Sequence, residues 1–148
     1  MNDTNCIVAV AAHAADMEFA AGGAILAHVR SAWKAHIVHL TLGEKGSATL
    51  SPEEYAEQKR QEALESARLL GAEAHFLPFA DGELPADDAV ATRLAILLRR
   101  LQPNVLLAHW SGSIHLDHTN AHHLALRARF MAAIRHFELE GLPPLAGC

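Results

Sequence analysis

Short apolar runs alternate with longer stretches of helical periodicity four times along the 148-residue chain. The apolar runs have no polar face, which is typical of strands in a parallel sheet that is covered on both sides. The predicted strands span residues 7–12, 36–42, 75–79 and 105–110, and the predicted helices span residues 17–31, 52–70, 87–101 and 118–139. We therefore predict an α/β fold, a three-layer Rossmann-like sandwich around a mainly parallel sheet of about four strands.

Local signals support two of the predicted helices. Ser51 precedes Pro52 and two acidic residues, which is the pattern of a capped helix start, and Gly71 provides the matching stop. Apolar residues recur on one face of residues 87–101, and Pro103 ends that helix. No linker or repeat divides the chain, so residues 1–148 are predicted to form a single domain.

Composition narrows the range of partners. The chain has 12 Lys and Arg against 17 Asp and Glu, a formal net charge of -5, without a run of like charges. This distribution argues against a nucleic-acid-binding surface and a polybasic membrane anchor. No apolar run approaches the roughly 20 residues of a membrane-spanning helix. Two cysteines and no recognisable secretory leader favour a cytoplasmic location, and a homo-oligomer is compatible with the sequence.

Polar residues that follow the predicted strands carry the candidate chemistry. His13 and Asp16 follow the first strand, whereas His115, Asp117 and His118 follow the fourth. Because the loops at the carboxyl ends of parallel strands share one rim, we expect these side chains to meet. His13, Asp16 and His118 would then hold a zinc ion with one position open for water, as catalytic zinc sites do.

Two other interpretations of this ligand set stay open. Two histidines and one carboxylate also describe the facial triad of non-haem iron oxygenases, although the alternation of strands and helices does not suggest an all-β barrel. Fe²⁺ or another divalent cation could therefore replace zinc. In the second alternative, the histidines only cap helices and form hydrogen bonds at the surface.

The ordered motifs resemble those of the LmbE-like or PIG-L zinc N-deacetylases, which remove acetyl groups from N-acetylglucosamine-containing and related substrates. Residues 12–18 (Ala-His-Ala-Ala-Asp-Met-Glu) are similar to the family motif Ala-His-Pro-Asp-Asp with its following x-Glu pair. Residues 115–118 (His-Leu-Asp-His) are similar to its His-Pro-Asp-His motif, and residues 43–46 resemble its Gly-Glu-x-Gly loop. The resemblance extends from about Cys6 to Cys148.

The resemblance implies a zinc-dependent amide hydrolase acting on an N-acetylated amino sugar. It implies that His13, Asp16 and His118 bind the zinc ion. His115 would face the developing oxyanion, and Asp117 would orient an imidazole by a hydrogen bond on the side away from the metal ion.

Two further residues correspond to substrate contacts in that family. Asp81 falls where the family contacts sugar hydroxyls, and the alternative is a turn-forming Asp-Gly pair. Lys59 aligns with a substrate-contacting arginine, and the alternative is a solvated helix face.

Position 15 departs from the family motif. Ala15 stands where the family has the general base, and Ala14 replaces the preceding proline. A positioned base typically contributes about 10²–10⁴-fold in rate, so we expect zinc binding to persist and hydrolysis to be impaired. Glu18 and Asp117 are the substitute bases considered, with Glu18 the poorer because it lies in the following helix.

The alternative function is a non-catalytic relative that binds a metal ion or a sugar. Family members also continue past the last predicted helix with further strands that help to wall the substrate pocket. We therefore expect the chain to lack the family's C-terminal portion.

Overall fold

The structure is a computed structural model that describes residues 5–146, so the terminal Cys148 lies outside the described residues. The elements follow in the order β1 (Cys6–Ala11), α1 (Asp16–Arg30), β2 (Lys34–His39), the short 3-10 helix η1 (Glu44–Gly46), α2 (Pro52–Leu70), β3 (Glu73–Phe76), α3 (Asp88–Leu101), β4 (Val105–Leu107) and α4 (Leu116–Ala133). Within the described range, no helix is both long and apolar enough to cross a membrane.

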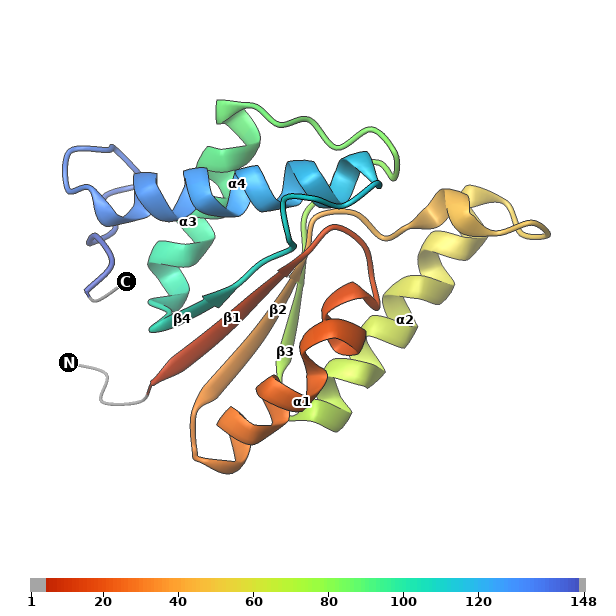
Figure 1. Ribbon diagram of the computed structural model, residues 1–148, viewed down its shortest axis with the longest axis horizontal. Helices are drawn as coiled ribbons and strands as arrows, with labels where there is room; N and C mark the ends of the chain where they lie inside the picture. The colour runs from red at the N-terminus through yellow and green to blue at the C-terminus, as the bar shows by residue number, and fades with distance from the viewer. Residues whose placement is uncertain (1–4, 147–148) are drawn as a thin grey trace.

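The four strands form one parallel sheet in the order β3-β2-β1-β4. Helices α1 and α2 cover one face of the sheet, and α3 and α4 cover the other (Figure 1). Strand β1 is central and buried along its whole length, since its sequence CIVAVA has no polar side to expose. The predicted three-layer α/β architecture is confirmed.

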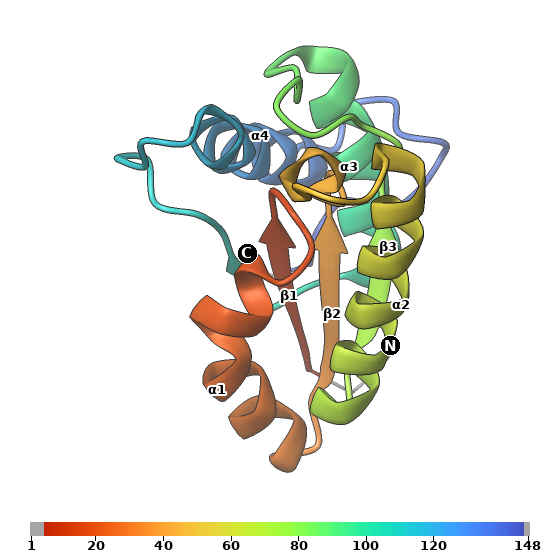
Figure 2. The same ribbon diagram turned by 90° about the vertical axis from the view of Figure 1, so that its right-hand side faces the viewer.

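Alternation along β1 divides the core between the two layers of helices. Val8 and Val10 point toward α3 and α4, where they belong to the same apolar cluster as Leu94. Ile7 and Ala9 point the other way and pack with residues of α1 and α2. Figure 2 shows β1 and β2 between these two groups of helices. The buried sheet therefore provides a rigid support for the loops at its carboxyl edge.

The ends of α2 follow the predicted local signals. The Ser51 side chain accepts a hydrogen bond from the Glu54 backbone N–H, while the Glu54 side chain accepts one from the Ser51 backbone N–H. Gly71 ends the helix with a φ of +73°, and a Cβ there would lie 2.8 Å from Cγ1 of Val29. Glycine is needed at this position for both its backbone conformation and its lack of a side chain.

The predicted end of the last helix is wrong, because α4 ends at Ala133 rather than near residue 139. Arg99 of α3 is only 3% exposed, and its guanidinium donates hydrogen bonds to the carbonyls of Met131, Ala132, Ile134 and Leu142. These bonds satisfy carbonyls at the end of α4 and hold the returning chain. A side chain far away in the sequence thus accompanies the helix end.

The strand boundaries also differ from those predicted. Strand β4 ends at Leu107 instead of residue 110, and the chain then leaves the sheet. The next polar residue, His109, turns toward β1, where its Nε2 accepts a hydrogen bond from the Ala12 N–H at 3.0 Å. Strands β2 and β3 begin two residues earlier than predicted and end three residues earlier.

Candidate metal centre

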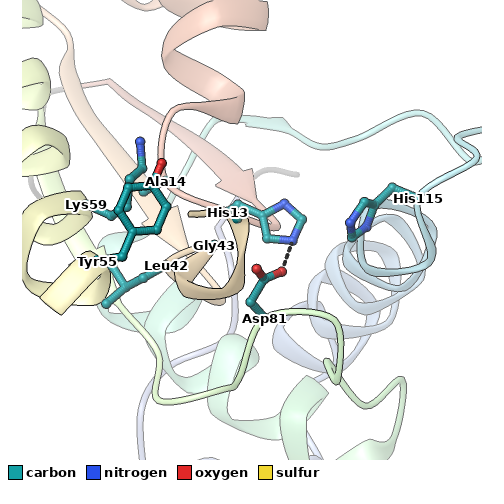
Figure 3. A pocket seen from close by; sticks show the side chains of 9 residues that line it. His13, Ala14, Leu42, Gly43, Tyr55, Lys59, Asp81 and His115 are labelled. Carbon is teal, nitrogen blue, oxygen red and sulfur yellow. Dashed lines mark ion pairs between the residues drawn. The ribbon is translucent and has the colours of Figure 1, made fainter. Parts of the chain in front are cut away.

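The carboxyl edge of the sheet brings together the motifs that the sequence separates by about a hundred positions. His13 and Asp16 come from the turn between β1 and α1, whereas Asp81 comes from the loop after β3. His115 is the residue that precedes α4, and His118 lies in the first turn of that helix. Figure 3 shows the side chains of His13, Asp81 and His115 close together, with Asp81 joined to His13 by an ion pair.

The three predicted metal ligands form a nearly equilateral triangle. Nδ1 of His13 lies 3.2 Å from Oδ2 of Asp16 and 3.2 Å from Nε2 of His118. The third side, from Nε2 of His118 to Oδ2 of Asp16, measures 3.4 Å. Tetrahedral zinc with bonds of about 2.0–2.1 Å requires ligand atoms roughly 3.3 Å apart. The donor types and their spacing therefore fit a zinc ion.

The electrostatics of two of these ligands also favour a cation. Burial opposes ionisation of Asp16, but its contact with His109 and its hydrogen bonds with His13, one of them from the His13 backbone N–H, hold the pKa of the carboxyl well below the usual range. Burial lowers the pKa of His118, which keeps this imidazole neutral at pH 7. An ionised carboxylate and a neutral imidazole are the forms that coordinate a metal.

The other nitrogen of His13 is held by two carboxylates. Its Nε2 lies 3.2 Å from Oδ2 of Asp117 and 3.1 Å from Oδ1 of Asp81. Burial by itself would lower the pKa of His13, but the surrounding carboxylates outweigh it and raise that pKa. Because Nε2 stays bonded to these carboxylates, a metal ion would displace the proton from Nδ1 and bind its lone pair. The structure thus places Asp117 within hydrogen-bonding distance of the His13 imidazole.

Asp117 is itself fixed by the loop after β3. Its side chain is 2% exposed, with Oδ2 accepting from the Gly82 N–H at 2.7 Å and Oδ1 from the Leu84 N–H at 3.3 Å. These contacts leave the Asp117 oxygens committed to three donors, counting Nε2 of His13. A carboxylate in this position is suited to holding His13 rather than to taking a proton from water in the cavity.

Asp81 lies in a turn and also lines the cavity. It precedes Gly82, whose φ of +73° marks a tight turn. Its Oδ2 accepts a hydrogen bond from the Lys45 N–H at 3.0 Å, and its own N–H donates to Oε1 of Glu44 at 2.7 Å. Asp81 therefore links the loops after β2 and β3, and it also forms part of the cavity wall beside His13.

A cavity of about 260 Å³ opens beside this triangle, lined by His13, Ala14, Leu42, Gly43, Gly46, Tyr55, Lys59, Asp81 and His115. Tyr55 and Lys59 of α2 lie on the opposite side from His115 (Figure 3). The Lys59 side chain is 14% exposed, and its ammonium lies 2.9 Å from Oε2 of Glu62. Lys59 therefore belongs to the cavity wall as well as to a helix-surface ion pair.

Gly43 allows the loop after β2 to approach the centre. Its φ is +76°, and a Cβ at this position would lie 3.3 Å from Cβ of His13. Both features disfavour any larger residue. The Gly-Glu-x-Gly loop thus packs directly against the proposed metal ligand.

His115 lies at the mouth of the cavity. It is exposed, and its ring meets that of His13 edge-on with centroids 4.7 Å apart. Its Nδ1 also accepts a hydrogen bond from the Asp117 N–H at 3.2 Å, which caps α4. The capping role and a position beside a bound ligand are therefore compatible.

Position 15 places no carboxylate near the metal ligands. Ala15 caps α1 with a φ of 88°, a conformation that an L-residue adopts at some cost. The Glu18 side chain is 8% exposed and faces Nε2 of His39 at 3.4 Å, inside the protein. Burial raises the pKa of Glu18 and lowers that of His39 to about 4. Glu18 is therefore poorly placed to replace the missing base.

Sequence analysis missed one residue of this centre. Nε2 of His109 lies 3.3 Å from Oδ2 of Asp16, and the His109 ring stacks on that of His118 at a centroid distance of 4.2 Å. The apolar run at residues 105–110 predicts that His109 lies within the fourth strand. Its signal was a polar residue at the carboxyl end of a parallel strand, where ligands gather.

Comparison with known proteins gives this centre a family context. The PIG-L sequence profile, described as GlcNAc-PI de-N-acetylase, matches residues 8–129. A curated 4-oxalmesaconate hydratase from Pseudomonas putida strain KT2440 is 33% identical over 92% of this chain and 57% of its own length.

Two solved structures share the fold closely. The crystal structure of GalB, the 4-carboxy-2-hydroxymuconate hydratase from Pseudomonas putida KT2440, matches with a TM-score of 0.90 and 31% identity, over 97% of this chain and 63% of the other. An N,N'-diacetylchitobiose deacetylase from Pyrococcus horikoshii also has a TM-score of 0.90, at 29% identity over 99% and 59% of the respective chains. The present chain thus spans less than two thirds of the length of these relatives.

Proposed function

The chain belongs to the PIG-L (LmbE-like) family, and on that premise we propose that its rim is the water-activating centre of a zinc-dependent enzyme. His13, Asp16 and His118 would hold the ion, which the spacing of their donor atoms supports. Zinc would supply Lewis acidity, which allows water to lose a proton near neutral pH. Asp117 and Asp81 keep His13 in the orientation that this binding requires.

We base the choice of reaction on the absence of a carboxylate at position 15. In the N-deacetylases that the motifs resemble, this carboxylate is the general base, and Ala15 has only a methyl group. We therefore propose hydration of a carbon–carbon double bond as the leading reaction. Water adds its oxygen to one carbon and a proton to the other, so no amine has to leave. Similarity to a curated hydratase sequence at 33% identity and to a solved hydratase structure at 31% identity, both from Pseudomonas putida KT2440, supports this choice.

The cavity suggests the class of substrate. Its volume of about 260 Å³ suits a small molecule, and Lys59 contributes a cationic group to its wall. A carboxylate on the substrate would pair with the Lys59 ammonium, which now faces Glu62. At the opposite side, the exposed His115 can donate a proton to the carbon that accepts one, while the attacking water loses a proton to solvent and His115 regains one from it. An unsaturated polycarboxylate, the type named for the hydratase relatives, meets these requirements.

N-deacetylation of an amino sugar is the second candidate. It is favoured by the description of the family profile and by the diacetylchitobiose deacetylase, which aligns with 99% of this chain. In this reaction His115 would stabilise the oxyanion of the attacked amide, and Asp81 would contact a sugar hydroxyl. The absence of a carboxylate at position 15 predicts a weak deacetylase.

One experiment distinguishes the two reactions. The zinc-loaded chain is incubated with 4-carboxy-2-hydroxymuconate, whose conjugated absorbance decays on hydration, and separately with N,N'-diacetylchitobiose, from which acetate is measured. We expect hydration that is abolished in His118→Ala, and little acetate. Acetate release without hydration, increased about 10²–10⁴-fold by Ala15→Asp, would instead identify a deacetylase. Stoichiometric zinc without turnover of either substrate would refute both reactions and favour a binding protein.

A further inference from the structure

A second group of possible metal-ligating side chains lies on two neighbouring strands, apart from the residues of the rim. His36 belongs to β2, and Glu73 and His75 belong to the edge strand β3. In the parallel register His36 pairs with Glu73, and Val38 pairs with His75. Since side chains alternate along a strand, all three groups project from the same face of the sheet. The strand pairing therefore creates a cluster that residue spacing alone does not reveal.

The possible ligand atoms of this cluster lie close together. Nδ1 of His36 lies 3.0 Å from Nε2 of His75 and 3.6 Å from Oε2 of Glu73. Oε1 of Glu73 lies 3.9 Å from Nε2 of His75. With one ligand atom taken from each residue, the three atoms lie within 4.8 Å of one another, and the roughly 3.3 Å expected between two ligands of tetrahedral zinc falls inside this limit. The cluster is thus close to the geometry of a site with two nitrogen ligands and one oxygen ligand.

The two imidazoles of the cluster are largely buried, whereas its carboxylate is exposed, and this arrangement suits a cation. The side chains of His36 and His75 are 11% and 20% exposed, whereas that of Glu73 is 68% exposed. Burial is the largest cause that lowers the pKa of both imidazoles, so both are neutral at pH 7. The two neutral imidazoles would supply lone pairs from the protein side, and the exposed carboxylate would bind the ion from the solvent side.

We propose that His36, Glu73 and His75 form a second divalent-cation site of the zinc type that links β2 to the edge strand β3. Two imidazoles and one carboxylate favour a borderline cation such as Zn²⁺ over Mg²⁺ or Ca²⁺, which prefer all-oxygen sites. The remaining coordination positions face solvent and would be filled by water. The site acts as a clamp on the sheet edge, because a bound ion stabilises the folded state in which the two strands are paired.

The alternative is a cross-strand hydrogen bond between two histidines, with Glu73 as a nearby surface acid. In this arrangement one imidazole donates its N–H to the other, and no cation is bound. The two interpretations differ in zinc stoichiometry and in the consequence of changing Glu73, which forms no part of the histidine–histidine bond.

Calorimetric titration of the chelator-stripped chain with Zn²⁺ at pH 7.5 tests the proposal. We expect two equivalents in the unaltered chain and one in His13→Ala, which removes a ligand shared by both candidate groups at the rim. In the His13→Ala background, Glu73→Gln and His75→Gln should each weaken the remaining equivalent at least 10-fold. The exposed His123→Gln is the matched control and should change nothing. Zinc should also raise the melting temperature of His13→Ala.

A single zinc equivalent in the unaltered chain, with none in His13→Ala, would overturn the proposal. So would a second equivalent whose affinity is the same in Glu73→Gln as in the His123→Gln control. Circular dichroism checks that each variant is folded. If His75→Gln does not fold, Glu73→Gln decides the question, because its exposed side chain can be changed without disturbing the core.

Discussion

Replacing Asp117 by asparagine should weaken both the metal centre and the fold. The carboxylate accepts from the Gly82 N–H at 2.7 Å, the Leu84 N–H at 3.3 Å and Nε2 of His13 at 3.2 Å. An amide keeps one oxygen and presents an NH₂ group in place of the other, so at least one buried donor faces another donor. Each unsatisfied buried group costs about 1–3 kcal/mol, and losing the charge weakens the remaining bonds. We expect a total loss of roughly 2–4 kcal/mol in the free energy of unfolding.

The same substitution should reduce zinc affinity about 10–100-fold, because His13 loses the carboxylate that fixes its orientation. Urea unfolding of the metal-free protein measures the first effect, and zinc titration against a competing chelator measures the second. Asp88→Asn is the control, since the Asp88 side chain is 72% exposed and pairs only with Arg127 at the surface among the described ion pairs. Zinc affinity that is equal in Asp117→Asn and Asp88→Asn would refute the role assigned to Asp117.

Three further predictions concern stability. Because burial lowers the pKa of His39 to about 4, below the ordinary 6.5, the unfolded chain takes up a proton first as the pH falls. The folded state is therefore about 3 kcal/mol more stable above pH 6.5 than at pH 4, and this difference is lost as the pH falls through that window. In urea unfolding, His39→Gln should show a flatter dependence of the free energy of unfolding on pH over the same window. A pH profile equal to that of the unaltered chain would contradict the assignment. Ala15→Gly should raise the free energy of unfolding by about 0.5–1 kcal/mol, since relief of the positive φ exceeds the added entropy of glycine in the unfolded chain. A loss of stability in urea would show that φ 88° is not strained. Arg99→Met should cost about 3–5 kcal/mol, because carbonyls at the end of α4 lose their donor, and a melting temperature equal to that of the unaltered chain would exclude this role.

The order and type of the elements could be predicted because their signals are local. Strand β1 is a continuous apolar run, and the start of α2 is encoded by Ser51, Pro52 and Glu54 within four positions. The rim could also be predicted, since parallel strands oblige His13 and His118 to meet at one edge. The LmbE-like family resemblance is confirmed by the match of the PIG-L profile to residues 8–129.

Tertiary structure decided what depends on pairing between distant segments. The end of α4 is held by Arg99, which lies more than thirty residues earlier in the chain. His109 reaches Asp16 only because β4 lies beside β1, and His36 meets His75 only through the register of β2 with β3. Hydrophobic periodicity specifies which face of an element is buried, but it carries no information on which polar side chains become neighbours across that face. Those contacts arise when the strands pair in a fixed register. They bring His36 next to His75 in the proposed second cation site, and they place His109 beside Asp16 at the rim.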